Sequence, residues 1–193
     1  VSDSAFTTSS ATLTAADLTA VGGATTGTVT VTNAVKISGN TTQLTNTLVS
    51  GSSSVTASSA LVTVSDAAFT TSSATIAATT LSNIGGKTSG AVTVTKAVKI
   101  TGSTADLTDT MRSGSSSVIA RSALVTVSDA AFASSSTAIA ATTLSNIGGK
   151  TTGAVTLANK VRLQGSQSEV ATALVGDSSV VASKANTEAR VTS

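Results

Sequence analysis

The chain contains no His, Cys, Tyr, Trp or Pro, and only three Phe among its 193 residues. The absence of cysteine excludes disulfide bonds, thiolate metal sites and thiol redox chemistry. Without His, Cys or Tyr, the usual catalytic bases and activated nucleophiles are missing as well. A Ser–Lys dyad stays open because serine is abundant, but no Ser/Lys spacing stands out. We therefore predict that the protein is not an enzyme and binds no cofactor.

Charged residues and long apolar runs are also scarce. Eleven Lys and Arg residues face nine Asp and Glu residues, which leaves a formal net charge of +2. The cations are scattered and there are few aromatic rings to stack on bases, so we expect no nucleic-acid binding. No apolar run approaches the ~20 residues of a membrane-spanning helix. With 40% hydrophobic residues and little charge, the composition is not that of a disordered chain.

A 63-residue repeat organises the chain. The segment Val1-Ser-Asp-Ser-Ala-Phe6 returns in nearly the same letters at Val64–Phe69 and Val127–Phe132, at intervals of 63 residues. Ile76–Lys87 recurs letter for letter as Ile139–Lys150. Periods of this length indicate an array or a solenoid. We divide the chain into repeat 1 (1–63), repeat 2 (64–126) and repeat 3 (127–193), the last of which includes the start of a fourth strand motif.

Several residue types recur in columns, meaning sets of positions one repeat apart. Glycine fills four columns in all three repeats: Gly22/Gly85/Gly148, Gly23/Gly86/Gly149, Gly27/Gly90/Gly153 and Gly39/Gly102/Gly165. Such regular glycine marks backbone that needs a positive φ or a close approach. Two further columns are Phe6/Phe69/Phe132 and Asp3/Asp66/Asp129. We predict structural roles for the Phe and Asp columns, for Gly39, Gly102 and Gly165, and for Gly85 and Gly86.

The aspartate column admits two interpretations. Each Asp precedes a polar turn, which favours an Asx-turn or a helix cap. A Ca²⁺ site is the alternative, but it needs roughly six to eight oxygen ligands, and no second carboxylate column lies nearby. We therefore predict no metal site.

Periodicity and capping signals place the elements. Leu and Ile or Val at i,i+3, followed by two glycines, predict short helices with glycine C-caps at 14–23, 77–86 and 140–149. Strict alternation predicts strands at 28–32, 91–95 and 154–158, and again at 34–38, 97–101 and 160–164. Capping boxes at Asn40-x-x-Gln43, Ser103-x-x-Asp106 and Ser166-x-x-Glu169 predict a second helix in each repeat. Strands at 60–64 and 123–127 follow, and 189–193 is an imperfect echo of them.

Basic residues form one column and one apparent motif. Lys36, Lys99 and Arg162 recur on the outward side of the second strand, where we expect a solvated face and not a binding patch. Gly85-Gly86-Lys87-Thr88 superficially resembles a phosphate loop. It ends a predicted helix, however, whereas a phosphate loop begins one.

These elements predict an α/β solenoid, with stacked parallel strands, short covering helices and about six coils in three repeats. The chain begins and ends inside the same kind of strand, and neither end resembles a dedicated polar cap. Exposed strand edges of this kind favour end-to-end pairing.

Three motifs carry a resemblance to a known class of proteins. They are Leu-x-x-Ile/Val-Gly-Gly, Ala-Val-Lys-Ile-Ser/Thr-Gly and Ala-Leu-Val-Thr-Val-Ser-Asp. With them the chain resembles the Ala/Ser/Thr-rich tandem repeats of giant secreted bacterial cell-surface proteins, including cyanobacterial ones. The resemblance covers nearly all the chain and implies an extracellular or cell-surface location and a structural or adhesive role.

Two functions are weighed from these features. The first is a structural repeat segment of an extracellular fibre, sheath, surface layer or adhesin stalk, whose partner is itself or a neighbouring repeat of a longer chain. The alternative is a solenoid that binds ice or a carbohydrate surface through outward Thr rows such as Thr28/Thr30/Thr32. The intervening coil offers Val118 and Ala120 where threonine would be needed, so the outward Thr are more simply strand formers on a wet face.

Overall fold

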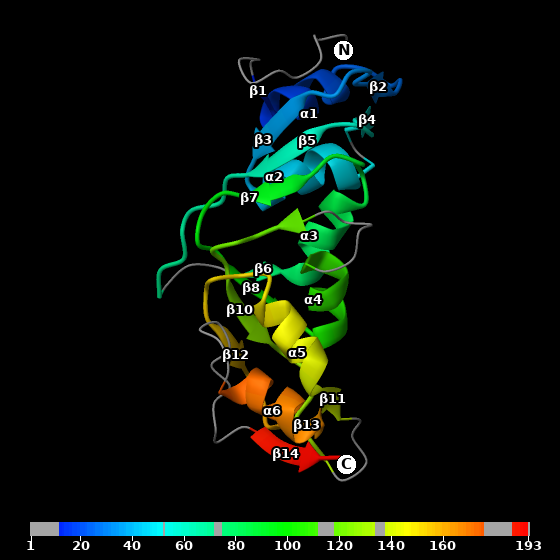
Figure 1. Ribbon diagram of the computed structural model, residues 1–193. Coiled ribbons are helices and arrows are strands. Elements are labelled where there is room, and N and C mark those ends of the chain that lie inside the picture. The colour runs from blue at the N-terminus through cyan, green and yellow to red at the C-terminus, as the bar shows by residue number, and fades with distance from the viewer. Residues whose placement is uncertain are drawn as a thin grey trace.

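The computed structural model describes residues 12–51, 53–71, 75–111, 118–133, 138–175 and 187–192. In these ranges the chain forms an α/β arrangement, with parallel strands in several sheets alternating with short helices. The elements succeed one another along an elongated stack, from β1 and α1 at one end to α6 and β14 at the other (Figure 1). Asp3 and Phe6, two of the predicted structural residues, lie outside the described residues.

The helices form one row along the stack. They are α1 (Ala15–Gly23), α2 (Thr41–Leu44), which continues into a π-helical turn η1 (Thr45–Val49), α3 (Ala78–Gly85), α4 (Thr104–Met111), α5 (Ala141–Gly148) and α6 (Gln167–Leu174). Each helix packs against the next, from α1 on α2 and η1 to α5 on α6. All three predicted capping boxes are formed, including the reciprocal bonds between Ser103 and Asp106.

The strands are short and every strand pair is parallel. They are β1 (Thr12–Thr14), β2 (Val29–Thr30), β3 (Lys36–Gly39), β4 (Val55–Thr56), β5 (Leu61–Val64), β6 (Ile76–Ala77), β7 (Val92–Val94), β8 (Lys99–Gly102), β9 (Val118–Ile119), β10 (Leu124–Val127), β11 (Ile139–Ala140), β12 (Val155–Leu157), β13 (Val161–Gly165) and β14 (Thr187–Val191). The sheet orders are β1-β3-β5-β7-β9, β12-β10-β8-β6, β11-β13-β14 and β2-β4.

The two larger sheets each join two repeats. In the five-stranded sheet, β1, β3 and β5 are followed by β7 and β9 of the next repeat. The four-stranded sheet repeats this plan one period later, with β6, β8 and β10 followed by β12. Neighbouring repeats are therefore joined through the strand pairs β5–β7 and β10–β12.

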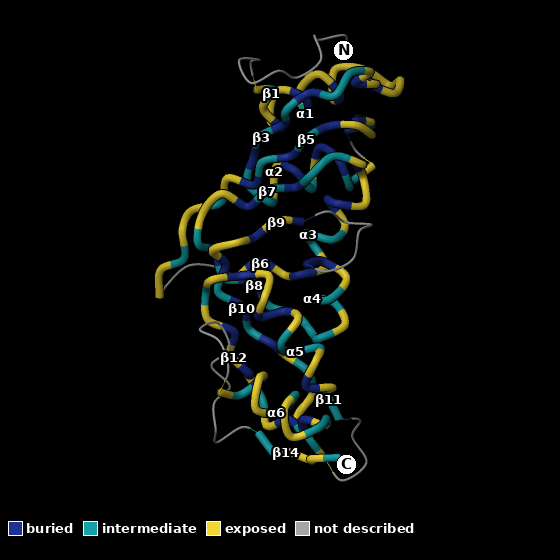
Figure 2. Tube along the Cα trace, viewed as in Figure 1, coloured by how far each residue is buried: buried dark blue, intermediate teal, exposed yellow. Residues whose placement is uncertain are grey.

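A thin core lies between the strands and the helix row. Ile37, Val62 and Val92 stand opposite one another on three adjacent strands, and each is almost completely buried. Leu81 of α3 and Leu107 of α4 are also completely buried. Figure 2 shows that buried stretches recur along the length of the stack. Small side chains and single Leu or Ile residues suffice to fill this core because it lies between one layer of strands and one layer of helices.

The helix ends differ from expectation in conformation. Gly86 and Gly149 do stand at the C-caps of α3 and α5, but with φ of −66° and −65°, in the right-handed helical region. None of the described glycines has a positive φ. The described glycines are therefore not explained by left-handed turns. Close approach explains part of them, such as Gly90 and Gly102, where a Cβ would lie less than 3.0 Å from another atom.

The last strand differs from expectation in register. The sequence echo at 189–193 aligned Val191 with Val125, whereas the structure places Val191 opposite Gly165, as Val127 stands opposite Gly102. β14 therefore takes the place of β10, in a register two residues away from the one that the sequence echo suggests. A shift of two keeps the same side chains on the inward face, so alternation could not distinguish the two registers.

Candidate functional site

Asp66 and Asp129 each cap a helix from a neighbouring strand. The Asp66 carboxylate accepts hydrogen bonds from the N–H and the hydroxyl of Thr41 at 2.7 and 2.9 Å. Asp129 accepts the same pair from Thr104 at 2.8 and 3.0 Å. Each carboxylate thus lies at the N-terminus of the helix that begins 25 residues before it, where negative charge is favoured. In the described residues, no group of three or more acidic, His or Cys side chains could hold a metal ion.

The predicted glycines fall into two physically different groups. An ideal Cβ on Gly39 or Gly102 would lie 2.8 Å from the Cβ of Ala15 or Ala78, the first residue of the helix above. On Gly165 it would lie 2.9 Å from a Glu169 carboxylate oxygen. On Gly86, by contrast, the nearest atom would be the Ser82 carbonyl oxygen, at 3.4 Å. Gly85 is buried inside α3.

Phe69 and Phe132 lie against residues of the basic column and not in the core. The Lys99 ammonium stands 5.4 Å from the centre of the Phe69 ring, and the Arg162 guanidinium stands 3.8 Å from that of Phe132. Arg162 also pairs with Glu188 at 2.9 Å. The expectation of a simply solvated basic face was therefore incomplete, because aromatic rings cover part of it.

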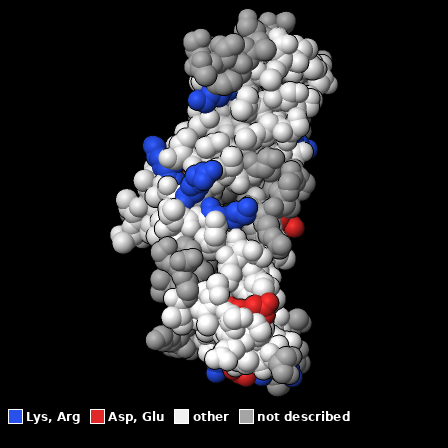
Figure 3. Space-filling model, in the orientation of Figure 1, with Lys and Arg blue, Asp and Glu red and all other residues white. Residues whose placement is uncertain are grey.

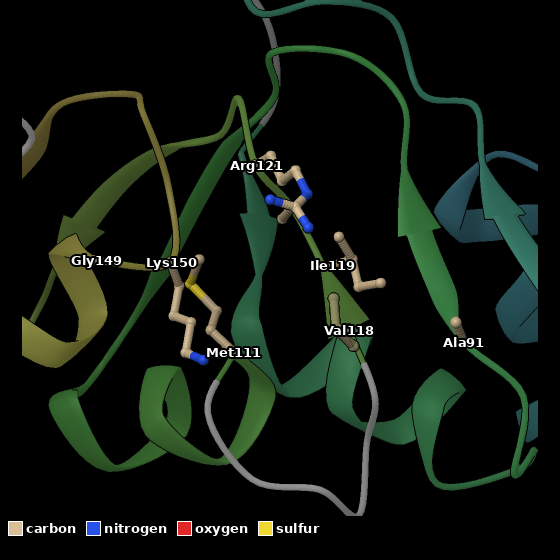
Figure 4. A pocket seen from close by; sticks show the side chains of 8 residues that line it. Ala91, Met111, Val118, Ile119, Arg121, Gly149 and Lys150 are labelled. Atoms are coloured by element: carbon tan, nitrogen blue, oxygen red, sulfur yellow. The ribbon is translucent and has the colours of Figure 1, made fainter.

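A hollow recurs at the same place in two repeats. The larger, of about 490 Å³, is lined by Ala91, Met111, Val118, Ile119, Ala120, Arg121, Gly149 and Lys150. The other, of about 360 Å³, contains the residues one repeat earlier, among them Thr28, Leu48, Val55 and Lys87. Figure 4 shows Lys150 beside Met111, and Arg121 beyond Ile119. Basic side chains also gather on the middle of the face seen in Figure 3. Among the described residues, those that line the larger hollow include two cations and no carboxylate, so they form no acid–base pair.

The contact between successive repeats is built twice from the same parts, and we call it the repeat joint. Its strands pair Val62, Thr63 and Val64 with Val92, Thr93 and Val94, and one period later Val125, Thr126 and Val127 with Val155, Thr156 and Leu157. The Thr88 hydroxyl donates to the Ala60 carbonyl at 2.5 Å and accepts the Gly90 N–H at 3.0 Å. Thr151, Ala123 and Gly153 repeat both bonds at the same distances.

A glycine at the repeat joint is required by contact with backbone. A Cβ on Gly90 would lie 2.2 Å from the Ala60 carbonyl oxygen, and one on Gly153 would lie 2.2 Å from that of Ala123. Helices meet at the same joint, since α3 packs on η1 and α5 on α4. Ile84 and Ile147, near the ends of α3 and α5, are fully buried.

At the two ends of the stack, the counterparts of these joint residues are exposed. Val21 of α1 is 48% exposed, although it corresponds to the fully buried Ile84 and Ile147. Val191 of β14 is 57% exposed, although it takes the place of Val64 and Val127, which are 0% and 1% exposed. The ends are thus the places where the described structure leaves apolar joint surface in contact with solvent.

Comparisons with protein-family models, with curated proteins and with solved structures find no match. Across the described residues, no helix combines the length and the apolar character needed to cross a membrane.

Proposed function

We propose that the chain is an α/β solenoid of about six coils that serves as a structural repeat segment of an extracellular fibre, sheath, surface layer or adhesin stalk. The observation that carries this proposal is the repeat joint, which occurs twice with one strand register and one set of threonine and glycine contacts. A contact that recurs without change lets units add along one axis, since each unit needs only its neighbours. The partner is a further copy or a neighbouring repeat, through end-to-end or lateral packing.

The cell-surface location and the adhesive or structural setting come from the resemblance of the sequence motifs to secreted bacterial tandem repeats. The residue types of the chain agree with a role without catalysis, because His, Cys and Tyr are absent from the sequence. The structural proposal requires no ligand in the recurring hollows.

Static light scattering over a wide concentration range tests the structural proposal. A segment that assembles shows an average mass that rises steadily with concentration, without a plateau at the dimer. A mass equal to that of a single chain at every concentration would remove the support for assembly.

A second candidate function, binding to ice or to a carbohydrate surface, is favoured by one observation. Thr14, Ser38, Thr63 and Thr93 stand opposite one another on four adjacent strands and form a row of hydroxyl side chains. Neighbouring strands lie about 4.8 Å apart, so the row is regular. The row is one residue wide, and it ends at the next strand, where Ile119 stands opposite Thr93.

Thermal hysteresis and sedimentation with insoluble polysaccharides measure this second function. Surface binding predicts that the activity falls when Thr63, in the middle of the row, is replaced by Lys. Thr79→Lys, at an exposed position of α3 outside the row, should leave the activity unchanged. If the wild-type protein neither shifts the freezing point nor sediments with any polysaccharide, surface binding is refuted and the structural proposal is the one that remains.

A further inference from the structure

We propose that the larger hollow binds a small amphipathic anion, with a carboxylate or phosphate head and an aliphatic chain. The head pairs with Arg121 and Lys150, and the aliphatic chain covers Ile119 and the apolar lining beside it. This site adds a ligand to the proposed structural role, and it does not depend on whether copies of the protein assemble.

The size and the lining of the larger hollow suit such a ligand. Its volume of about 490 Å³ lies within the range of about 300–1,000 Å³ that is usual for small-molecule sites. Such sites are mostly apolar and carry a few polar groups that fix the orientation of the ligand. Here the apolar part includes Met111, Val118 and Ile119, and among the described lining residues the polar side chains are those of Arg121 and Lys150. The charge of this lining is positive, which favours an anion.

The two cations are accessible to a ligand. Both side chains are exposed, and Figure 4 shows Arg121 on the Ile119 side of the hollow and Lys150 on the Met111 side. In the part of the chain that the structure describes, neither side chain forms a hydrogen bond or an ion pair. The fork of an arginine holds two oxygens of a carboxylate or a phosphate, and the lysine adds a second positive charge. An anionic head therefore displaces no described partner from either cation.

The backbone beside the hollow is fixed by hydrogen bonds between repeats. The Arg121 carbonyl accepts the Thr152 N–H at 2.7 Å and the Thr152 hydroxyl at 3.1 Å. One repeat earlier, the Ser58 carbonyl accepts the Ser89 N–H at 2.8 Å and the Ser89 hydroxyl at 3.0 Å. The larger and the smaller hollow therefore share this part of the backbone and differ in the side chains that it carries.

The sequence difference between the two hollows is the observation that carries the inference. The stretch 50–69 recurs one repeat later, letter for letter, except that Thr56 becomes Ile119 and Ser58 becomes Arg121. Both of the new side chains line the larger hollow. A larger apolar group and a positive charge thus replace two polar, uncharged side chains at the same place, while the rest of the stretch is unchanged. These are the two properties that an amphipathic anion requires of its site.

Ile119 is an apolar side chain that the described contacts leave uncovered in the middle of the stack. It is 38% exposed. The other large apolar side chains that are exposed in the described ranges, Val21, Val175 and Val191, belong to the first and last elements (Figure 2). An aliphatic chain that lies on Ile119 removes apolar surface from water, and this contributes to binding in proportion to the area covered.

Met111 provides a specific reporter of the larger hollow, because it is the only methionine in the sequence and lines the hollow. Its methyl group, labelled with ¹³C, is followed by NMR on dilute protein during titration with sodium decanoate and, separately, with decyl phosphate, both below their micelle concentrations. We expect a saturable shift of this signal, and the head group that binds more tightly identifies the class of anion. Acetate, which lacks the chain, and 1-octanol, which lacks the charge, should bind at least roughly tenfold more weakly.

A double substitution gives the larger hollow the two residues of its earlier copy. With Ile119→Thr and Arg121→Ser together, we expect the dissociation constant for the tighter amphiphile to rise roughly tenfold or more. Lys96→Asn is the matched control, because it removes one exposed positive charge outside the hollow and asparagine stands at that position one repeat earlier. It should bind like the wild type. On wild-type protein, high salt should weaken the binding, because salt screens exposed charges.

Three results would each overturn the inference. They are the absence of a saturable shift with either amphiphile, equal affinity for decanoate and 1-octanol, and wild-type affinity in a double variant that circular dichroism shows to be folded. Binding that high salt weakens, and that the double variant loses while Lys96→Asn retains it, supports the inference. Because light scattering measures assembly separately, failure of ligand binding leaves the proposed structural function standing, and failure of assembly leaves the ligand site standing.

Discussion

Two glycine columns of the same repeat should respond to alanine with opposite signs. Gly102→Ala would set a methyl carbon 2.8 Å from the Ala78 Cβ and 3.2 Å from the Asp106 Cβ. Carbon atoms in contact normally stand about 3.5–4.0 Å apart. The strand or the helix must therefore shift, and overpacking of this kind costs about 1–3 kcal/mol.

Gly86→Ala meets no such obstacle. Its φ of −66° suits any residue, and the new methyl group would stand 3.4 Å from the Ser82 carbonyl oxygen. Replacing glycine by alanine in a compatible conformation stabilises the folded state by about 0.4–1 kcal/mol, because the unfolded chain loses freedom. Gly149→Ala, with its nearest contact at 3.5 Å, should behave alike in repeat 3.

Thermal unfolding followed by far-ultraviolet circular dichroism, on protein dilute enough to remain single chains, measures both effects. In a domain of this size 1 kcal/mol corresponds to about 2–4 °C in Tm. We expect Gly102→Ala to melt several degrees below the wild type and Gly86→Ala to melt slightly above it. A Gly102→Ala variant as stable as the wild type, or a Gly86→Ala variant that loses stability, would refute the assignment of the two columns.

Substitutions at three further positions, Asp129, Leu144 and Phe132, probe other contacts by denaturant unfolding. Asp129→Ala removes both acceptor oxygens from Thr104 and should lower the free energy of unfolding by about 1–2 kcal/mol. Asp129→Asn keeps one acceptor oxygen and should lower it by less. Equal losses in the two variants would argue that Asp129 does not act as a helix cap. Leu144→Ala leaves a cavity at a completely buried site in α5 and should lower the free energy of unfolding by about 2–5 kcal/mol. A loss below about 1 kcal/mol would contradict the claim that Leu144 is part of a packed core. Phe132→Leu removes the aromatic ring that lies against Arg162 and should lower the free energy of unfolding by about 0.5–1 kcal/mol. In a chain that already carries Arg162→Gln, the same substitution should no longer cause this loss.

The local elements could be predicted from the sequence because their signals are local. Capping boxes fixed the starts of the second helices, and alternation of Val with Thr marked strands such as β7 and β12. The helix faces also followed from spacing, since Leu81 and Ile84 are both buried in α3.

The order of strands across the sheets could not be predicted in the same way. β3, β5 and β7 carry similar alternating patterns, so each fits beside any other. The pairing of β5 with β7 is accompanied by contacts between distant residues, such as the hydrogen bond from the Thr88 hydroxyl to the Ala60 carbonyl. Thr25, Thr88 and Thr151 recur one repeat apart in the sequence. The hydrogen bonds that Thr88 and Thr151 donate to the preceding repeat follow only from the order of the strands.

The roles of the aspartate and phenylalanine columns depended on the same neighbours. Asp129 lies next to Thr104 only because β10 runs beside β8. Phe132 reaches Arg162 from the loop after β10, a contact between residues far apart in sequence. Sequence spacing showed that both columns recur, and the parallel pairing of successive strands determines what each one touches.

Electron microscopy of the purified chain, dilute and concentrated, tests the central claim most directly. Assembly through the repeat joint predicts unbranched filaments one stack wide, which lengthen with concentration and whose axial repeat equals the length of one stack. Single short particles at every concentration would contradict the proposal that copies of this chain assemble.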